Sequence, residues 1–232
     1  MTISAVAATD VGLARNRNED AFLIDDGASL YAIADGMGGH AAGDVASQTA
    51  IAAFSAAFHE TRSVLAAMKS ANRAVHERSA REPEHSGMGT TLTGLHIFGN
   101  TAFVAHVGDS RLYRLHDAAL EQLTTDHTVA QDMIDQGTLN KHDAMRHPLS
   151  SMLKRSLGLR PDVDVDVFQT EIVTGDIFML CSDGLTGMVT DEDLCAMLLE
   201  PKKMEASAAE LVKAANMRGG LDNITVVLIR IS

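Results

Sequence analysis

The chain is poor in aromatic residues, in cationic residues and in cysteine. It has no Trp, and its aromatic residues are two Tyr and seven Phe among 232 residues. Only 19 Lys and Arg stand against 31 Asp and Glu, so the formal net charge is −12. Nucleic acids are bound through basic patches and aromatic stacking faces, and this composition therefore predicts no nucleic-acid partner. Two Cys are too few for a disulfide framework in a chain of this length.

Long hydrophobic runs are absent as well. The uncharged stretch Val45–Phe58 is rich in Ala and polar residues and is shorter than the roughly 20 apolar residues of a membrane helix. No basic segment precedes an apolar run near the N-terminus, so the sequence predicts no secretory signal. Because 46% of the residues are hydrophobic, a disordered acidic tail is excluded. We therefore expect a cytoplasmic, monomeric protein without a membrane partner, folded as one domain over residues 1–232.

Apolar runs alternate with Gly-containing breaks at short intervals, which is typical of strands. Several runs are continuously apolar, as in strands that are covered on both faces. Strands are predicted at Ile3–Ala8, Ala21–Ile24, Leu30–Ala34, Thr91–Phe98, Thr101–Val107, Arg111–Leu115, Val163–Glu171, Ile177–Cys181 and Ile224–Ile231. Ala-rich segments and a 3.6-residue period predict helices at Asp44–Glu60, Ser63–Arg81, Asp191–Leu199 and Met204–Met217.

The order of these elements predicts the fold class. Runs of strands followed by pairs of helices, without regular strand–helix alternation, favour the α+β class, in which helices cover antiparallel sheets. The segment Asp126–Gly158 is polar, rich in His and Met, and only weakly periodic. We expect it to form a surface flap that leaves the core and contributes to substrate selection.

Acidic residues flank several of the predicted strands, often with a Gly directly after them. Asp-Gly is common in turns, and this is the simplest explanation of any single case. Carboxylates that converge at one sheet rim would repel one another unless a dication lay between them. Oxygen ligands without clustered His or Cys favour Mg²⁺ or Mn²⁺ over Zn²⁺. The acids concerned are Glu19, Asp20, Asp35, Asp183 and Asp222.

Seven short motifs occur in one order along nearly the whole chain. Each motif is weak alone, but the ordered set is specific. The motifs are Arg15-Asn-Arg-Asn18-Glu19-Asp20, Asp35-Gly36-Met37-Gly38-Gly39-His40, Gly89-Thr90-Thr91, Gly108-Asp109-Ser110-Arg111, Leu123-Thr-Thr-Asp126-His127, Ser182-Asp183-Gly184 and Asp222-Asn223. Together they resemble the motif set of the PP2C (PPM) family of metal-dependent serine/threonine protein phosphatases, in its bacterial form.

This resemblance implies a fold and a metal centre. Two mainly antiparallel sheets would pack face to face between helical layers, giving a four-layer α-β-β-α sandwich with a flap. Two Mn²⁺ or Mg²⁺ ions would lie at one rim, where Asp35 would bridge them and the Gly36 carbonyl would bind one of them. Asp183 and Asp222 would complete the ligands of the second ion. Asp126 and Asp183 match the ligands of a third ion that bacterial members often hold.

The resemblance also implies a mechanism. Glu19 and Asp20 would act mainly through metal-bound waters, and Asp20 would orient the bridging water. As hydroxide, that water would attack phosphorus in line, without a phosphoenzyme. Arg15 would bind the substrate phosphate through its guanidinium. The substrates would be phosphoserine and phosphothreonine in proteins, and the implied partner is a cognate Ser/Thr kinase whose action is reversed.

One position departs from the family pattern. Met37 stands where many eukaryotic relatives carry a His that is proposed to protonate the leaving group, and Met cannot donate a proton. His40 is the candidate proton donor in this chain. The alternatives are that a metal-bound water supplies the proton, or that His40 packs against or caps the following helix.

Two other functions are compatible with parts of the sequence. The segment Gly36–Gly43 follows an apolar strand and opens a helix, as a dinucleotide-binding fingerprint does. Against this, Asp35 would face a pyrophosphate, and the acid expected at the end of a second strand is missing. The other alternative is a catalytically silent PP2C-like interaction module. The presence of every expected carboxylate and of Arg15 favours the enzyme.

Overall fold

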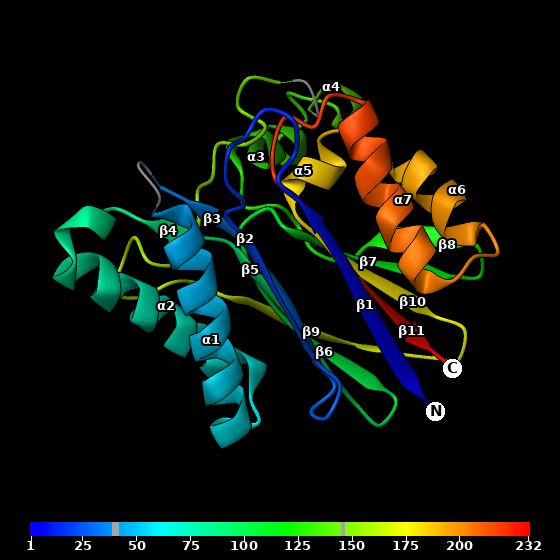
Figure 1. Cartoon of the computed structure of the whole chain (residues 1–232), viewed down its shortest axis with the longest axis horizontal. Helices are drawn as coiled ribbons and strands as arrows, with labels where there is room; N and C mark the ends of the chain where they lie inside the picture. Colours follow the sequence, from blue (N-terminus) through cyan, green and yellow to red (C-terminus); the bar gives the residue numbers. More distant parts are fainter. Residues whose placement is uncertain (39–41, 145–146) are drawn as a thin grey trace.

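Two β-sheets packed face to face form the centre of the molecule (Figure 1). The computed structural model describes residues 1–38, 42–144 and 147–232, and its named strands all pair antiparallel. The first sheet has the order β1 (Ile3–Asp10), β11 (Ile224–Ile231), β10 (Ile177–Cys181), β7 (Arg111–His116) and β8 (Ala119–Gln122). The second has the order β2 (Asp20–Asp25), β3 (Leu30–Met37), β5 (Leu92–Phe98), β6 (Thr101–Val107) and β9 (Asp166–Glu171), and β4 (Gly89–Thr90) pairs with β3.

Helices cover the outer face of each sheet (Figure 1). Helices α1 (Gly43–Thr61) and α2 (Val64–Arg81) pack on the second sheet, whereas α6 (Asp191–Leu199) and α7 (Met204–Met217) lie on the side of the first. Four shorter helices lie between these elements, and none of the helices in the described ranges has the length and apolar character needed to cross a membrane. These short helices are η1 (Pro83–His85), α3 (Val129–Asp135), α4 (Lys141–Ala144) and α5 (Asp183–Thr186).

The two-residue period of β3 decides which side chains enter which layer. Its even-numbered residues from Leu30 to Ala34 belong to the apolar cluster beneath α1 and α2. Tyr31 and Ile33 point the other way, into the apolar cluster between the two sheets. Successive side chains of a strand alternate between faces, so Asp35 continues the inter-sheet side. The carboxylate therefore stands where the layer between the sheets ends.

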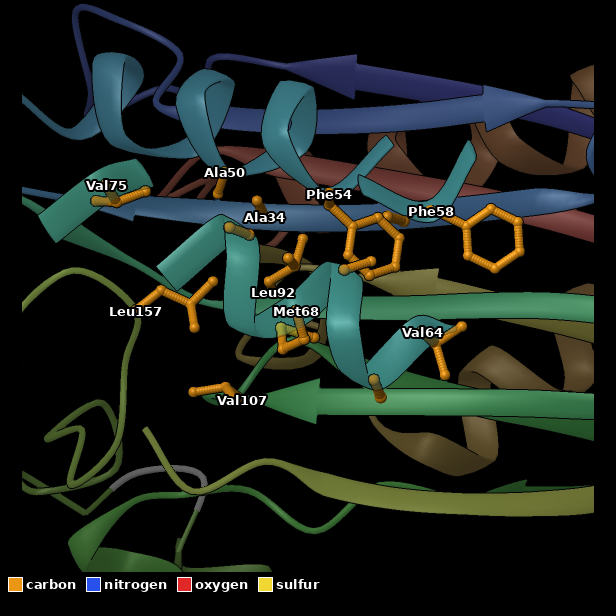
Figure 2. Close-up of a cluster of buried hydrophobic side chains, with 14 of the residues drawn as sticks. Ala34, Ala50, Phe54, Phe58, Val64, Met68, Val75, Leu92, Val107 and Leu157 are labelled. Atoms are coloured by element: carbon orange, nitrogen blue, oxygen red, sulfur yellow. The ribbon is translucent and has the colours of Figure 1, made fainter. Parts of the chain in front are cut away.

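The first helical layer is held by aromatic and aliphatic side chains that fit small residues of the sheet. Phe54 and Phe58 of α1 are fully buried and lie between the helix and the second sheet (Figure 2). The Phe54 ring lies over Gly94, where an added Cβ would come within 2.4 Å of its Cζ. Ser63 caps α2 by accepting a hydrogen bond from the Ala66 amide at 3.2 Å.

The predicted α+β class and the four-layer arrangement are confirmed, as are the four long helices. The strand predicted at Val163–Glu171 begins later, at Asp166. Val163 and Val165 instead pack against the cluster beneath α1 and α2, which accounts for their apolar character. The segment predicted as a flap contains helices α3 and α4, and an isolated bridge pairs Thr128 with Leu153 near its two ends.

The close fit at Gly94 gives a stability prediction. Gly94→Ala places a methyl group against the buried Phe54 ring, and overpacking of this kind costs about 1–3 kcal/mol. For a chain of this size the melting temperature should fall by roughly 2–10 °C. Gly27→Ala is the matched control, because its nearest atom would be 3.5 Å away, and it should melt close to the parent protein. Equal melting temperatures of the two variants in thermal denaturation would contradict the packing described here.

Candidate metal and phosphate site

Two of the predicted acids are opposite one another in neighbouring strands. The register of β2 against β3 pairs Asp20 with Asp35. Side chains of directly opposed residues in an antiparallel pair are about 5 Å apart, and like charges there are destabilising. This pairing brings together two residues that are separated by a hairpin in the sequence. The strand register itself thus creates a concentrated negative charge at the rim.

Two further acids reach the same rim from the first sheet. Asp183 follows β10 and begins α5, while Asp222 precedes β11, the strand that pairs with β10. The two segments touch through backbone, because a Cβ on Gly184 would lie 2.0 Å from the carbonyl oxygen of Asn223. The Gly after Asp183 is therefore required by close backbone approach. The four predicted acids Asp20, Asp35, Asp183 and Asp222 do converge.

The proximity of these acids raises several of their pKa values. Burial, the main cause, together with the charges of Asp183 and Asp222, raises the pKa of Asp20 to about 7, against hydrogen bonds that lower it. Burial and then the charge of Asp222 raise the pKa of Asp183 to about 6. The pKa of Asp35 is raised well above its ordinary range by burial, and further by Asp20 and Asp183. The protein alone does not stabilise all of these charges.

The donor set fits a divalent cation that prefers oxygen ligands. Among the described residues, Oδ1 of Asp20 and Oδ1 of Asp183 are buried and have no hydrogen-bond partner. Buried carboxylate oxygens without partners are costly, and a bound dication removes both this cost and the repulsion between the acids. Within residues 1–38, 42–144 and 147–232, no His or Cys takes part in the convergence, which suits Mn²⁺ or Mg²⁺. The residues present therefore fit the cations predicted from the sequence.

Hydroxyl groups fix the backbone of Asp35, and close packing requires the Gly that follows it. The Asp35 amide donates to Thr91 Oγ1 at 2.8 Å, and Thr90 Oγ1 donates to the Asp35 carbonyl at 2.8 Å. At Gly36 an added Cβ would lie 2.0 Å from the Gly43 carbonyl oxygen, so only Gly fits there. The sequence motif Gly89-Thr90-Thr91 was part of the family resemblance, but nothing in its spacing predicted that it supports Asp35.

Asn223 positions the loop that carries Arg15 and Glu19. Its Oδ1 accepts a hydrogen bond from the Glu19 amide at 2.8 Å, and its Nδ2 donates to the carbonyls of Val11 and Arg17 at 2.8 and 2.7 Å. The side chain is buried and uses both ends of its amide. Sequence reasoning assigned no role to Asn223, because these contacts join segments about 200 residues apart. The only signal was its place beside Asp222.

Arg15 lies at the open side of this group. Nη2 of its guanidinium donates to Oδ2 of Asp222 at 2.7 Å, and its side chain is 51% exposed. Within the described part of the chain, the guanidinium has no other hydrogen-bond partner, so most of its donors remain free. Glu19 is part-buried in the same loop, and burial raises its pKa. Arg15 and Glu19 are thus both placed at the predicted site.

Asp126 has a different environment from the four central acids. The Arg111 guanidinium donates to both of its carboxylate oxygens, from Nε at 2.9 and 3.0 Å and from Nη2 at 2.7 Å. Asp126, Asp109 and Asp183 all line one cavity of about 140 Å³. The predicted pair for a third ion, Asp126 and Asp183, therefore shares a cavity, but Arg111 neutralises the first of them. The candidate proton donor His40 lies outside the described residues.

Comparison with known proteins agrees with this geometry. A model of the protein phosphatase 2C family matches residues 14–222. The serine/threonine phosphatase stp of Listeria monocytogenes is 38% identical over 234 residues, covering 95% of this chain and 93% of that protein. The serine/threonine protein phosphatase PstP of Mycobacterium tuberculosis is 40% identical over 234 residues, which are 98% of this chain but 45% of that longer protein.

Solved structures show the same similarity. The crystal structure of PstP/Ppp from Mycobacterium tuberculosis has a TM-score of 0.93 at 38% identity, with full coverage of both chains (100% each). The catalytic domain of a PstP in complex with two manganese ions has a TM-score of 0.90 at 37% identity, covering 99% of each chain. Stp1 from Staphylococcus aureus gives 0.93 at 30% identity, covering 100% of this chain and 96% of that one. The chain belongs to the protein phosphatase 2C family.

The clustered acids predict how metal changes stability. Mn²⁺ at about 100 times its dissociation constant should stabilise the parent protein by about 2.7 kcal/mol, or roughly 5–10 °C in melting temperature. Asp35→Asn removes one charge from the cluster, so this variant should melt higher than the parent protein in EDTA. It should also lose most of the shift caused by Mn²⁺.

Glu205→Gln serves as the control, because Glu205 is exposed on α7 and the substitution removes the same charge. Differential scanning fluorimetry with EDTA and with Mn²⁺ gives both quantities. A Mn²⁺ shift that survived in Asp35→Asn would show that the cation binds elsewhere.

Proposed function

We propose that this chain is a metal-dependent phosphatase that hydrolyses phosphoserine and phosphothreonine in proteins. The observation that carries the proposal is the convergence of Asp20, Asp35, Asp183 and Asp222 beside a half-exposed Arg15. Membership of the protein phosphatase 2C family and the similarity to serine/threonine phosphatases support the same activity. We treat residues 1–232 as one catalytic domain.

The rim would hold two Mn²⁺ or Mg²⁺ ions. Asp35, the Gly36 carbonyl, Asp183 and Asp222 are the residues that would bind them, and the relative with two manganese ions supports this number. When bound, the ions lower the pKa of a shared water and neutralise charge on the phosphate. A third ion at Asp126 would require the Arg111 guanidinium to give up its hydrogen bonds to that carboxylate.

The chain's own residues bind the phosphate and orient the water. The free guanidinium donors of Arg15 suit two phosphate oxygens, so an incoming phosphate can share this cation with Asp222. Asp20 is held by a 2.8 Å hydrogen bond from Ser182 Oγ to its Oδ2, which leaves Oδ1 free to accept from a water. Glu19, whose backbone is fixed by Asn223, would orient a second water. Positioning of this kind is the main protein contribution to phosphoryl transfer.

The identity of the partners follows from this activity. Phosphorylated proteins are the substrates, and we infer that a cognate Ser/Thr kinase produces them. We also propose that the protein acts in the cytoplasm as a monomer, with the flap around 126–158 contributing to selection. Both cysteines, Cys181 and Cys195, are unpaired, which suits a reducing compartment.

The activity itself distinguishes the enzyme from a silent interaction module. The parent protein should hydrolyse p-nitrophenyl phosphate and a phosphothreonine peptide with Mn²⁺, and EDTA should abolish both reactions. Asp183→Asn should lower kcat by at least about 100-fold, because it removes one charge of the proposed ligand set. A pure preparation that remained inert with Mn²⁺ between pH 7 and 9 would falsify the enzymatic assignment.

Arg15 has a separate test. Arg15→Ala should raise KM for the phosphopeptide by about 10- to 100-fold, since hydrogen bonds to charged groups contribute about 1.5–3 kcal/mol. Mn²⁺ binding, followed by calorimetry, should be retained. Arg17→Ala removes an exposed cation two residues away and should change KM little. Loss of Mn²⁺ affinity in Arg15→Ala, with KM unchanged, would assign Arg15 to the metal site instead.

A further inference from the structure

A basic pocket lies beside α2, on the far side of β4 from the acidic rim. It has a volume of about 590 Å³ and is formed by α2 together with residues 154–164. Five cationic side chains and two acids line it, although the chain as a whole carries a net charge of −12. The cations are Lys69, Arg73, Lys154, Arg155 and Arg160, and the acids are Asp162 and Asp164.

Three of these cations have no ion-pair partner among the described residues. Lys154 pairs with Asp132, and Arg155 pairs with Asp166 at 2.6 Å. The other three, Lys69, Arg73 and Arg160, are exposed and form no ion pair with another residue in the part of the chain that the structure describes. Asp162 and Asp164 offset part of this positive charge, but the cations outnumber them. Like charges in one concavity repel one another, and a bound anionic group would offset the repulsion that remains.

The wall that carries Arg160 is rigidly attached to α2. Asn72 is buried and donates from Nδ2 to the carbonyls of Arg160 and Pro161 at 3.1 and 3.0 Å. Its Oδ1 accepts from the Gly158 amide at 2.9 Å. Leu157 and Val75 of α2 belong to the same apolar cluster (Figure 2). The backbone of this wall is thus held in place before any ligand binds, which lowers the ordering cost of binding.

Backbone pairing connects this pocket to the acidic rim. Gly36 pairs with Thr90 in the β3–β4 ladder, and Thr90 forms an antiparallel bridge with Leu157. Adjacent strands are about 4.8 Å apart, so the backbone of Leu157 lies roughly 10 Å from that of Gly36. An extended peptide advances about 3.3 Å per residue. Ser156, the neighbour of Leu157, lines the pocket. A residue at least about three positions from the phosphate would span this distance.

We infer that this pocket binds an acidic segment of the phosphoprotein substrate. Carboxylates, or further phosphorylated residues, in that segment would pair with Lys69, Arg73 and Arg160 while the phosphate to be hydrolysed lies at the rim. This inference rests on the proposed phosphatase function. It assigns part of the substrate selection to a surface outside the metal centre, and it predicts that small phosphate esters are unaffected by the pocket.

The test compares phosphothreonine peptides that differ only in flanking charge. One set carries three Glu residues beginning three positions before or after the phosphothreonine, and the other carries Gln at the same positions. The parent protein should show a KM about three- to tenfold lower for at least one acidic peptide, because exposed ion pairs contribute about 0.2–1 kcal/mol each. The preference should weaken as ionic strength is raised.

Arg73→Gln/Arg160→Gln should remove this preference and leave kcat/KM for p-nitrophenyl phosphate unchanged. Lys203→Gln/Lys213→Gln is the matched control, because it removes two exposed cations on the opposite helical layer and should retain the preference. Equal KM values for acidic and neutral peptides in the parent protein, or a preference that survives in Arg73→Gln/Arg160→Gln, would overturn the inference.

Binding of the same peptides, measured by fluorescence anisotropy, separates the two proposals. If no preparation hydrolyses p-nitrophenyl phosphate, the phosphatase function fails, while tighter binding of an acidic peptide that depends on Arg73 and Arg160 would still support the pocket. Binding that is equal for acidic and neutral peptides would reject the pocket, whatever the catalytic result.

Discussion

Repulsion among buried carboxylates at one rim is the constraint that the surrounding structure has to balance. The described residues supply few compensating groups: Ser182 donates to Asp20, and Arg15 donates to Asp222. The raised pKa values of Asp20 and Asp183 and their unpartnered oxygens show that this compensation is incomplete. Added positive charge stabilises such an arrangement, and bound divalent cations supply it. The same clustered carboxylates therefore destabilise the metal-free protein and provide the ligands for the catalytic metal ions.

The fold places these acids through its backbone. Strand register sets Asp20 against Asp35, and a close approach of chain segments at Gly184 brings Asp183 to the residues before β11. Neither arrangement depends on a flexible side chain, so the acids stay in place whether or not a cation is bound. The loop that carries Arg15 is placed in a similar way, because the Asn223 side chain forms three hydrogen bonds to the backbone of this loop. Rigid placement is what phosphoryl transfer requires of a protein.

The charges of this acidic chain are unevenly distributed over the molecule. Part of the negative charge is concentrated at the rim, where cations offset it. Five cationic side chains gather in the pocket beside α2, and three of them have no ion-pair partner in the described part of the chain. The two regions are joined by the pairing of Gly36, Thr90 and Leu157. A protein substrate therefore meets a positively charged surface next to the metal centre, although the chain as a whole would repel an acidic partner.

The sequence by itself determined the α+β class, the long helices and the candidate acids, because apolar periodicity and ordered motifs are local signals. It also showed that Gly36 and Gly184 directly follow two of these acids, without saying which backbone segments approach them. Only the tertiary structure decided that Asp20 lies opposite Asp35. It alone decided that Arg111 forms an ion pair with Asp126, and that Asn223 binds the backbone of the loop before Glu19. The structure also showed that Val163 and Val165 pack beneath α1 and α2 and are not part of a β-strand. These features depend on contacts between residues far apart in the chain, and such contacts leave no periodic pattern in a single sequence.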